Sequence, residues 1–496
     1  MSAPASDSAS ATPSALTRLD PRLFQRNIRV YYLFMASTGF MIFLPVWIIY
    51  LMDGRGLSLT EVGVIESFFW LTVIIAEVPT GAVADRFGRR ISLALGAILF
   101  AISTVIFSLA DGFSLLLGSY LVMGLGMTLY SGAGDALLYD TLRVLRRTGE
   151  YERHAGRAHG LFFAAMVLAT AVGGPAAYLL GYTATILVSS ALFLASAVAA
   201  MLLREPPRRE SDFPPDPLHA APANVRHTAS DIAQHEASGV PILQEMTRGF
   251  GVVWRNRPIR YLIPFAAITT TLFGLPHFMA QPYVAQHGLN PLDGAVDGFV
   301  WSALLIPGQI GTVLGMLVAA RLIARLGERR SFPAILVYGS VCLIPLAIWN
   351  HLGLLGAIFM VSIAQAAIRP ITNGYINRRI TSNQRATVLS IFSLVHGGAM
   401  SIAVLAILPA ADLISFPVAF GIAFLAVVTL GAGLWLLWHL AHRRDQTERI
   451  RRWSISVPKP QAPQSRPQAL QPPDPNGRNG RNGDGSALYP NVQNLD

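Results

Sequence analysis

The sequence predicts an all-α membrane protein, with 12 transmembrane helices in two pseudo-symmetric six-helix bundles and both termini in the cytoplasm. Three observations predict this fold: twelve apolar stretches of membrane-spanning length, arginines gathered in alternate connections, and a second half that repeats features of the first. The composition agrees, because 52% of the residues are hydrophobic and only 13% are charged, whereas about 25% of the residues of a soluble domain are charged.

The apolar stretches have the length that a bilayer requires. A helix of about 20 mostly apolar residues crosses the hydrocarbon core and satisfies its own backbone hydrogen bonds there. Such stretches lie at about 29–52, 62–84, 91–110, 114–138, 158–181, 183–203, 259–284, 297–324, 332–350, 352–376, 384–409 and 414–440.

The arginines orient these stretches, because cytoplasmic loops collect positive charge during insertion. Arg86 and Arg143 follow the second and fourth stretches, and Arg325 and Arg378 follow the eighth and tenth. The other connections lean acidic, as at Asp412. Topology thus accounts for the net charge of +10, and we expect contact with the lipid bilayer and no nucleic-acid partner.

Composition also divides the chain into segments. The apolar stretches form two groups of six, and the segments outside them are rich in polar residues, Pro, Gly or Ala, which bury too little apolar surface to fold. The single cysteine, Cys342, excludes an intrachain disulfide. We expect a disordered cytoplasmic N-terminus (1–24), an N-terminal six-helix bundle (25–203), a cytoplasmic linker (204–258), a C-terminal six-helix bundle (259–442) and a disordered cytoplasmic tail (443–496).

The two groups of stretches repeat one another at a shift of about 230 residues. Parallel repeats of this kind place a substrate site near the middle of the membrane, where the halves can rock about it. Matching features in the same order are Leu44-Pro45 with Leu275-Pro276, Arg86–Arg90 with Arg325–Arg329, and Arg157-Ala158 with Arg385-Ala386.

One loop carries a specific motif. Residues 81–90 read GAVADRFGRR and match the pattern G-x-x-x-D-R-x-G-R-R at every defined position. With this motif the chain resembles the major facilitator superfamily over residues 25–440. Three further segments resemble its bacterial drug/proton antiporter branch: EVPTG at 77–81, SGAGDALLYD at 131–140 and RATVLS at 385–390. The resemblance implies a transporter that works by alternating access without a cofactor.

The motif predicts a conformational latch. Gly81 would let two helices approach closely, and Asp85 can accept hydrogen bonds from arginines or from a helix N-terminus. The resemblance implies that this N-terminus belongs to the eleventh helix and that the contact closes the cytoplasmic side. The alternative is a solvated Asp85 in an ordinary basic hairpin. The expected latch residues are Gly81, Asp85, Arg86, Gly88, Arg89 and Arg90.

Carboxylates inside the apolar stretches are candidates for proton coupling, because an ionised acid in the membrane is costly. Glu66 and Glu77 share one face of the second helix. The alternatives are a solvated interfacial acid for Glu66 and a hydrogen-bond partner of the loop arginines for Glu77. In the fourth helix we expect Asp140 in the loop charge network, and we hypothesise that Asp135 pairs with Arg369 of the tenth helix in one conformation.

Several other side chains are candidates for the lining of a central cavity. Histidines can relay protons near neutral pH, glutamines offer neutral hydrogen bonds, and aromatic rings suit amphipathic or cationic cargo. Ordinary packing is the alternative for each of them. The candidates are Trp47, Trp70, His277, Gln309, Gln365 and His396.

Other activities find no support in the sequence. There is no phosphate-binding loop, no His/Cys cluster for a metal and no nucleophile elbow, so we expect neither an enzyme nor a cofactor. The leading prediction is a monomeric, proton-coupled exporter of small hydrophobic or amphipathic compounds in the cytoplasmic membrane of a bacterium. The alternatives are a proton symporter that takes up a small, possibly anionic metabolite, with Arg369 as the anion clamp, and a non-transporting sensor or lipid-handling protein.

Overall fold

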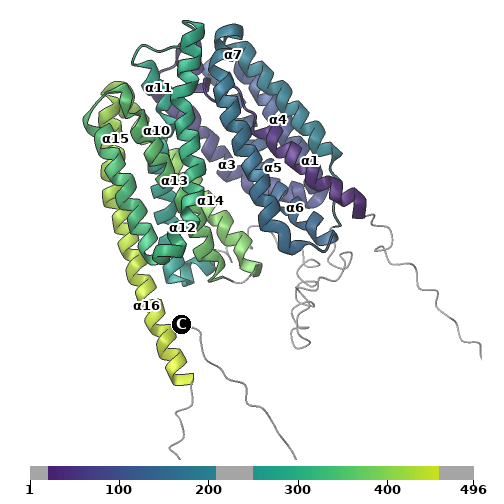
Figure 1. Cartoon of the computed structure of the whole chain (residues 1–496), viewed down its shortest axis with the longest axis vertical. Coiled ribbons are helices and arrows are strands. Elements are labelled where there is room, and N and C mark those ends of the chain that lie inside the picture. Colours follow the sequence, from purple (N-terminus) through teal and green to yellow (C-terminus); the bar gives the residue numbers. More distant parts are fainter. Residues whose placement is uncertain (1–20, 208–249, 381, 457–496) are drawn as a thin grey trace, which may run out of the picture. The chain divides into compact units, whose positions relative to one another are not determined.

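The computed structural model describes residues 21–207, 250–380 and 382–456, which form helices joined by turns (Figure 1). Most of the expected N-terminus (1–24), linker (204–258) and tail (443–496) lies outside these residues. The described residues 21–24 belong to the first helix and residues 443–456 to the last. The helices are α1 (Pro21–Gly39), α2 (Trp47–Ile49), the π-helical η2 (Tyr50–Gly54), α3 (Leu59–Phe87), α4 (Arg89–Leu109), α5 (Phe113–Tyr130), α6 (Ala133–Val144), η3 (Thr148–Glu150), α7 (Tyr151–Leu202), α10 (Arg257–Phe278), α11 (Ala280–Ala285), α12 (Ala295–Ile348), η6 (Leu352–Leu354), α13 (Leu355–Asn377), α14 (Ser382–Leu413), α15 (Phe416–Ala426), η7 (Val427–Gly431) and α16 (Ala432–Ser456).

Twelve membrane crossings follow from these elements. Nine helical segments within the described residues are long and apolar enough to cross a membrane. Two of them contain two crossings each: α7 has 52 residues and α12 has 54, and a straight helix of about 50 residues would be about 75 Å long. Each turns back at a glycine in the left-handed region, Gly181 (φ 76°) or Gly327 (φ 67°). The polar, interrupted helix α1 supplies the remaining crossing, so the predicted 12-helix fold is confirmed.

Two crossings are not the continuous helices that apolar length alone suggests. The first breaks between Gly39 and Trp47, where Pro45 has no N–H to donate. At Gly39 the chain also approaches α7 closely, since a Cβ there would lie 2.3 Å from the carbonyl oxygen of Phe162. The fourth crossing breaks between α5 and α6 at Gly132, with φ 74°. These breaks leave backbone groups that need partners outside their own helix.

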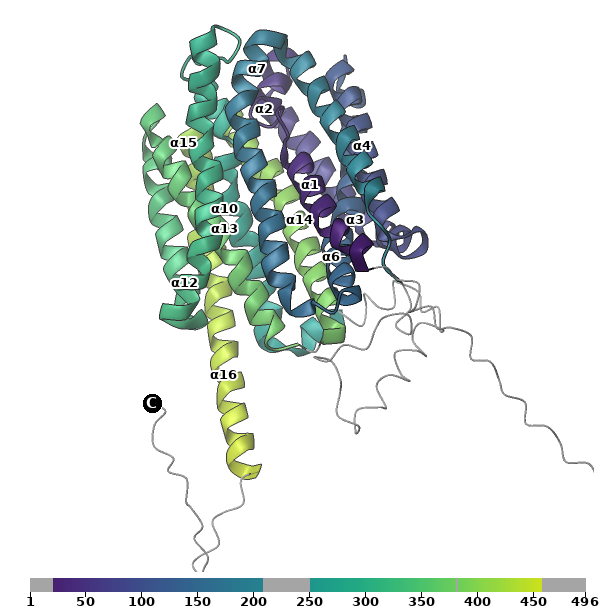
Figure 2. The same cartoon turned by 45° about the vertical axis from the view of Figure 1, so that its right-hand side comes forward.

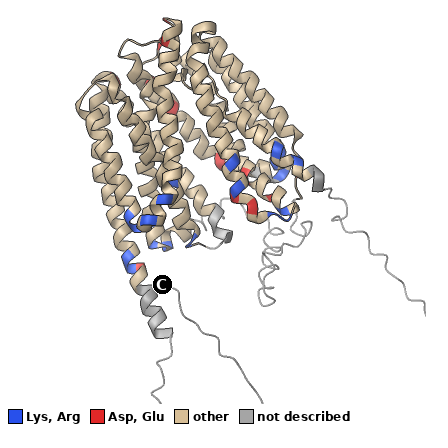
Figure 3. Ribbon diagram, in the orientation of Figure 1, with Lys and Arg blue, Asp and Glu red and all other residues tan. Residues whose placement is uncertain are grey.

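The crossings form two halves, and their charges define two ends. The N-terminal half consists of α1 to α7 and the C-terminal half of α10 to α16, in purple to blue and in green to yellow respectively (Figures 1 and 2). Arginines gather at one end of the bundle (Figure 3), which we call the arginine-rich end. The positive-inside rule makes it the cytoplasmic end. We call the end away from these arginines the opposite end.

At the opposite end, hydrogen bonds join the two halves directly. Burial raises the pKa of Asp53 there, as does the nearby charge of Asp293. The bonded pairs are Asp53–Asn290 (2.6 Å), Thr60–Asp412 (2.5 Å), Ser67–Ser401 (2.6 Å), Gly174–Ser302 (3.0 Å) and Tyr182–Asn290 (3.0 Å). The structure therefore shows the state in which the opposite end is closed.

Candidate functional site

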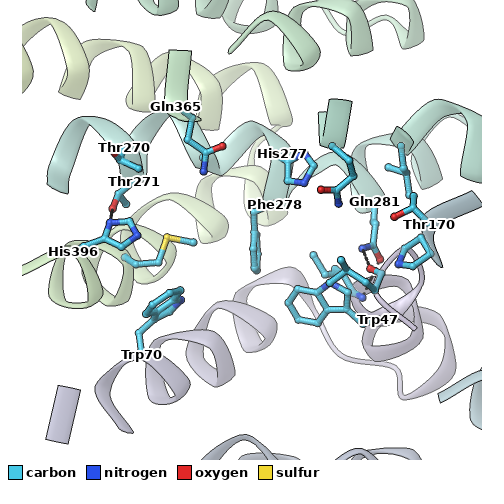
Figure 4. A pocket seen from close by; sticks show the side chains of 17 residues that line it. Trp47, Trp70, Thr170, Thr270, Thr271, His277, Phe278, Gln281, Gln365 and His396 are labelled. Atoms are coloured by element: carbon cyan, nitrogen blue, oxygen red, sulfur yellow. Dashed lines mark hydrogen bonds between the residues drawn. The ribbon is translucent and has the colours of Figure 1, made fainter. Parts of the chain in front are cut away.

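A pocket of about 350 Å³ lies between the two halves (Figure 4) and is called the central pocket. Its volume is within the range of small-molecule sites. All six side chains that the sequence suggests for a cavity line it: Trp47, Trp70, His277, Gln309, Gln365 and His396. They come from α2, α3, α10, α12, α13 and α14, so both halves contribute to one pocket.

Aromatic rings form one part of the wall. Trp47 meets Phe278 edge to face, with ring centroids 5.5 Å apart, and Trp70 meets His396 in the same way at 5.8 Å. Each pair joins one ring of the N-terminal half to one of the C-terminal half. Within the described part of the chain, the buried indole nitrogen of Trp70 has no hydrogen-bond partner. Its N–H could therefore donate a hydrogen bond to an acceptor atom of a bound ligand.

Neutral polar groups form another part of the wall of the central pocket. The Nδ1 atom of His396 lies 3.2 Å from the Thr271 hydroxyl. Buried Nδ1 of His277 has no hydrogen-bond partner among the described residues. The Gln365 amide lies against Gly274, where a Cβ would be 2.7 Å from Nε2. The pocket thus offers hydrogen bonds without a fixed charge.

Gln281 of α11 also lines the pocket, and the sequence reasoning did not identify it. Its Nε2 atom donates to the Leu44 carbonyl oxygen at 2.8 Å, and its Oε1 atom accepts from the Ile48 amide at 3.0 Å. Both partners belong to the break in the first crossing. The Leu-Pro sequence at this break, which the second half repeats, was the available signal.

The two acids of α3 have different surroundings. Glu66 is only 6% exposed and is hydrogen-bonded to the Tyr120 hydroxyl, so the expectation of a solvated interfacial acid is wrong. Burial of that carboxyl follows from its position between α3 and α5. Glu77 is half-buried, and within the described residues it has neither an ion pair nor a hydrogen bond with a loop arginine.

Asp135 and Arg369 are not paired in this state. Asp135 accepts a hydrogen bond from the Tyr31 hydroxyl at 3.4 Å and lies 4.0 Å from Nε2 of His159. Arg369 of α13 is exposed, and the charge of Asp135 acts on it without direct contact. The hypothesised pair would require the halves to approach each other.

The motif loop is tied into the N-terminal half. Gly88, with φ 104°, directly precedes α4. The Arg89 side chain pairs with Asp140 and donates to the Ala136 carbonyl oxygen. The backbone amides of Arg89 and Arg90 donate to the two carboxylate oxygens of one acid, at 2.8 Å each. That acid is Glu205, which the sequence reasoning also missed.

The proposed latch contact itself is not seen. The side chain of Asp85 and those of residues 382–386 at the start of α14 lie outside the described residues. A Cβ at Gly81 would meet no described atom within 4 Å, so the expected close approach of another helix is absent from what the structure describes. The latch role of Gly81, Asp85 and Arg86 stays a prediction.

Two repeated six-crossing halves that share a pocket are an architecture typical of secondary transporters. Residues 31–403 and 302–473 match the family model of the Major Facilitator Superfamily. The chain belongs to this superfamily, and its predicted resemblance is confirmed.

Individual relatives match over shorter stretches. The quinolone resistance protein NorA of Staphylococcus aureus is 24% identical over 142 residues, which cover 29% of this chain and 35% of NorA. A protein of Escherichia coli (strain K12) named "Probable L-galactonate transporter" is 30% identical over 120 residues, 24% of this chain and 25% of its own length. The chain thus matches about a third or less of these relatives.

Solved structures share the fold over much more of the chain. The nucleoside transporter NupG superposes with a TM-score of 0.61 at 10% identity, covering 85% of this chain and 99% of that one. A bacterial homologue of the human lysosomal transporter Spinster superposes with a TM-score of 0.58 at 17% identity, covering 87% and 98%. These likenesses concern the fold alone.

Proposed function

We propose that this protein is a secondary active transporter that exports small hydrophobic or amphipathic compounds in exchange for protons, by alternating access. The observation that carries the proposal is the central pocket, which both halves line and which hydrogen bonds between the halves close at one end. The partial similarity to NorA supports export. We further propose that it acts as a monomer in the cytoplasmic membrane of a bacterium.

The lining of the central pocket supports an apolar or amphipathic cargo. Among the described residues that line it there is no Asp, Glu, Lys or Arg. A charged molecule without a counter-charge would lose its hydration in such a site at a large cost in free energy. Flat apolar molecules can instead stack on Trp47 and Trp70, while the glutamine amides orient their polar atoms.

Glu66 is our first candidate for the proton-carrying group. It is buried behind the pocket wall, because its partner Tyr120 has its ring 6.4 Å from that of Trp47. The next residue, Ser67, bonds to Ser401 of the other half. A change of charge at Glu66 would therefore act both on the wall of the pocket and on a contact that closes the opposite end.

Transport into inverted membrane vesicles tests the proposal. When a fluorescent hydrophobic compound without net charge is added to vesicles with an acidic interior, we expect accumulation of the compound together with release of protons. Glu66→Gln should lower this exchange about tenfold or more, as loss of an essential proton carrier does. The matched control is Glu61→Gln, an exposed acid of the same helix that, among the described residues, has its hydrogen bonds to Ser58.

Cargo binding, measured by quenching of tryptophan fluorescence, should persist in Glu66→Gln. Equal proton release by the wild type and by Glu66→Gln would exclude Glu66 as the carrier. No accumulation of any hydrophobic compound would argue against export itself.

One observation favours the alternative, uptake of a small anionic metabolite by symport with protons. Arg369 is exposed, and among the described residues no carboxylate lies within ion-pair distance of it. The partial similarity to the protein named L-galactonate transporter points the same way. Uptake of a radiolabelled sugar acid by intact cells, abolished in Arg369→Gln and retained in Arg369→Lys, would support this alternative. Transport in neither direction would leave the non-transporting sensor or lipid-handling protein.

A further inference from the structure

Side chains of the C-terminal half occupy the hydrogen-bonding groups of the broken first crossing. In a continuous α-helix the Ile48 amide would donate to the Leu44 carbonyl, and the Ile49 amide to the Pro45 carbonyl. In the structure, the Gln281 amide lies between the members of the first pair, at 2.8 Å from the Leu44 oxygen and 3.0 Å from the Ile48 nitrogen.

The second pair is occupied in the same way. The indole nitrogen of Trp301 donates to the Pro45 carbonyl oxygen at 2.7 Å. Oε1 of Gln281 also accepts from the Ile49 amide, at 3.4 Å. Two side chains from α11 and α12 therefore replace two consecutive helical hydrogen bonds of the other half.

These replacements are buried. Gln281 is 7% exposed and Trp301 is 0% exposed. Backbone groups inside a membrane protein must find partners within the protein. If the halves separate at the opposite end, Gln281 and Trp301 withdraw, and four backbone groups of the first crossing lose their partners at once. Each of these groups can then bond to its partner in a regular helix, Leu44 to Ile48 and Pro45 to Ile49.

We propose that the break in the first crossing is a reversible exchange of backbone hydrogen bonds that accompanies opening of the opposite end. With this end closed, Gln281 and Trp301 hold the break. With this end open, Leu44 bonds to Ile48 and Pro45 to Ile49, so the helix closes. The number of backbone bonds is nearly conserved, which removes a large barrier to opening. The proposal rests on the proposed alternation of the two halves.

Gln281 also connects this exchange to the central pocket, which it lines (Figure 4). Leu44 and Ile48 line the same pocket. A cargo that bonds to the Gln281 amide competes with the broken helix for the same donor and acceptor. Binding would therefore favour withdrawal of Gln281 and closure of the helix, which opens the opposite end.

Two measurements on the full-length protein test the exchange. Spin labels at Leu109→Cys and Leu413→Cys, in a Cys342→Ser background, report the separation of the halves, because both positions are exposed ends of helices at the opposite end. Hydrogen exchange of the Ile48 and Ile49 amides, measured by mass spectrometry, reports whether the helix is closed. Gln281→Met keeps the length of the side chain and removes its hydrogen bonds.

We expect Gln281→Met to raise the population with the long label distance about tenfold relative to the population with the short distance, since the buried hydrogen bonds of the Gln281 amide to Leu44, Ile48 and Ile49 are lost. The Ile48 and Ile49 amides should stay protected in the open state. The matched control is Gln286→Met, because Gln286 bonds to Asn350 within its own half. Trp301→Phe keeps a ring and loses the N–H, so it should also raise the population with the long label distance. It replaces Gln281→Met in the test if that variant does not fold.

Two results would overturn the exchange: equal label distances in Gln281→Met and Gln286→Met, or an open population whose Ile48 and Ile49 amides exchange freely. A single label distance in every variant, with or without cargo, would instead contradict the alternation of the halves.

Discussion

The two ends of the molecule are held together in different ways. At the opposite end, neutral and charge-assisted hydrogen bonds cross between the halves, as between Gly174 and Ser302. At the arginine-rich end, the described ion pairs stay within a half: Arg89 with Asp140 in the first, and Glu328 with Arg378 and Arg379 in the second. The opposite end, which is closed in the structure, is thus the end at which hydrogen bonds rather than ion pairs join the halves.

This difference separates two tasks. A neutral hydrogen bond contributes about 1 kcal/mol net, so a set of them can be broken and replaced during a cycle. An ion pair at the margin of the membrane leaves an uncompensated charge when it breaks, which costs about 1–3 kcal/mol or more. Ion pairs within each half therefore suit a rigid body, and hydrogen bonds between the halves suit a gate.

The ion pairs of the two halves also carry their charges in opposite positions: the base of one pair stands where the acid of the other stands. In the internal repeat Arg89 corresponds to Glu328, since each follows the glycine of the turn. Their partners at the end of the fourth and tenth crossings are reversed as well, Asp140 against Arg378. The repeat has kept the contact and exchanged its charges, which indicates that the contact between the two crossings is what matters.

The largest effect is expected at Gly174, where α7 of one half packs closely against α12 of the other. Gly174→Ala places a Cβ 2.2 Å from the Gly298 carbonyl oxygen and 2.6 Å from the Ser302 hydroxyl. Because both neighbours belong to α12, the halves must move apart. Overpacking costs about 1–3 kcal/mol, so the ratio of closed to open states at this end should fall about 5- to 150-fold. The separation of spin labels at Leu109 and Leu413 measures it.

A glycine with open space is the control. At Gly118 of α5 a Cβ meets no described atom within 4 Å, so Gly118→Ala should leave the label distances unchanged. If both variants behaved like the wild type, Gly174 would not be part of the closure.

A smaller effect is expected at the arginine-rich end, and in a different quantity. Glu328→Ala leaves Arg379, which is 12% exposed, without this carboxylate partner. We expect about 1–2 kcal/mol less stability of the C-terminal half, seen as a lower midpoint of thermal unfolding in detergent. The label distances at the opposite end should not change, because the pair lies within one half.

The charge-exchanged variant sharpens this prediction. Glu328→Arg combined with Arg378→Glu reproduces the order of the N-terminal half and should restore part of the unfolding midpoint. A midpoint as low as that of Glu328→Ala would show that the contact depends on the order of the charges.

The fold could be predicted because its signals are local in the sequence. Apolar length and alternating arginines require only neighbouring residues, and they yielded the confirmed 12-helix fold. Much of the pocket lining could also be predicted from the sequence, because a polar side chain such as His277 or Gln365 in a membrane helix usually faces the interior of the protein.

The remaining parts depend on contacts between distant residues. Gln281 lies 237 residues from Leu44, and no periodicity relates its amide to that carbonyl. Glu205 lies 116 residues from Arg89, in a segment that composition assigned to a linker. The burial of Glu66 likewise depends on Tyr120 of another helix. Such residues become visible only when the helices are placed side by side.

The smallest effect is expected at the exposed rim of the opposite end. There the Asp412 carboxylate accepts from the Thr60 amide at 3.1 Å and from its hydroxyl at 2.5 Å, so a helix of one half is capped by an acid of the other. Exposed, charge-assisted contacts contribute about 0.5–1 kcal/mol, and Asp412→Ala should therefore lower the closed-to-open ratio about two- to fivefold. The matched control is Asp111→Ala, because Asp111 pairs with Arg55 within one half at the same end. An equal shift of the label distances in both variants would mean that acidic residues of this end act through general charge rather than through contacts between the halves.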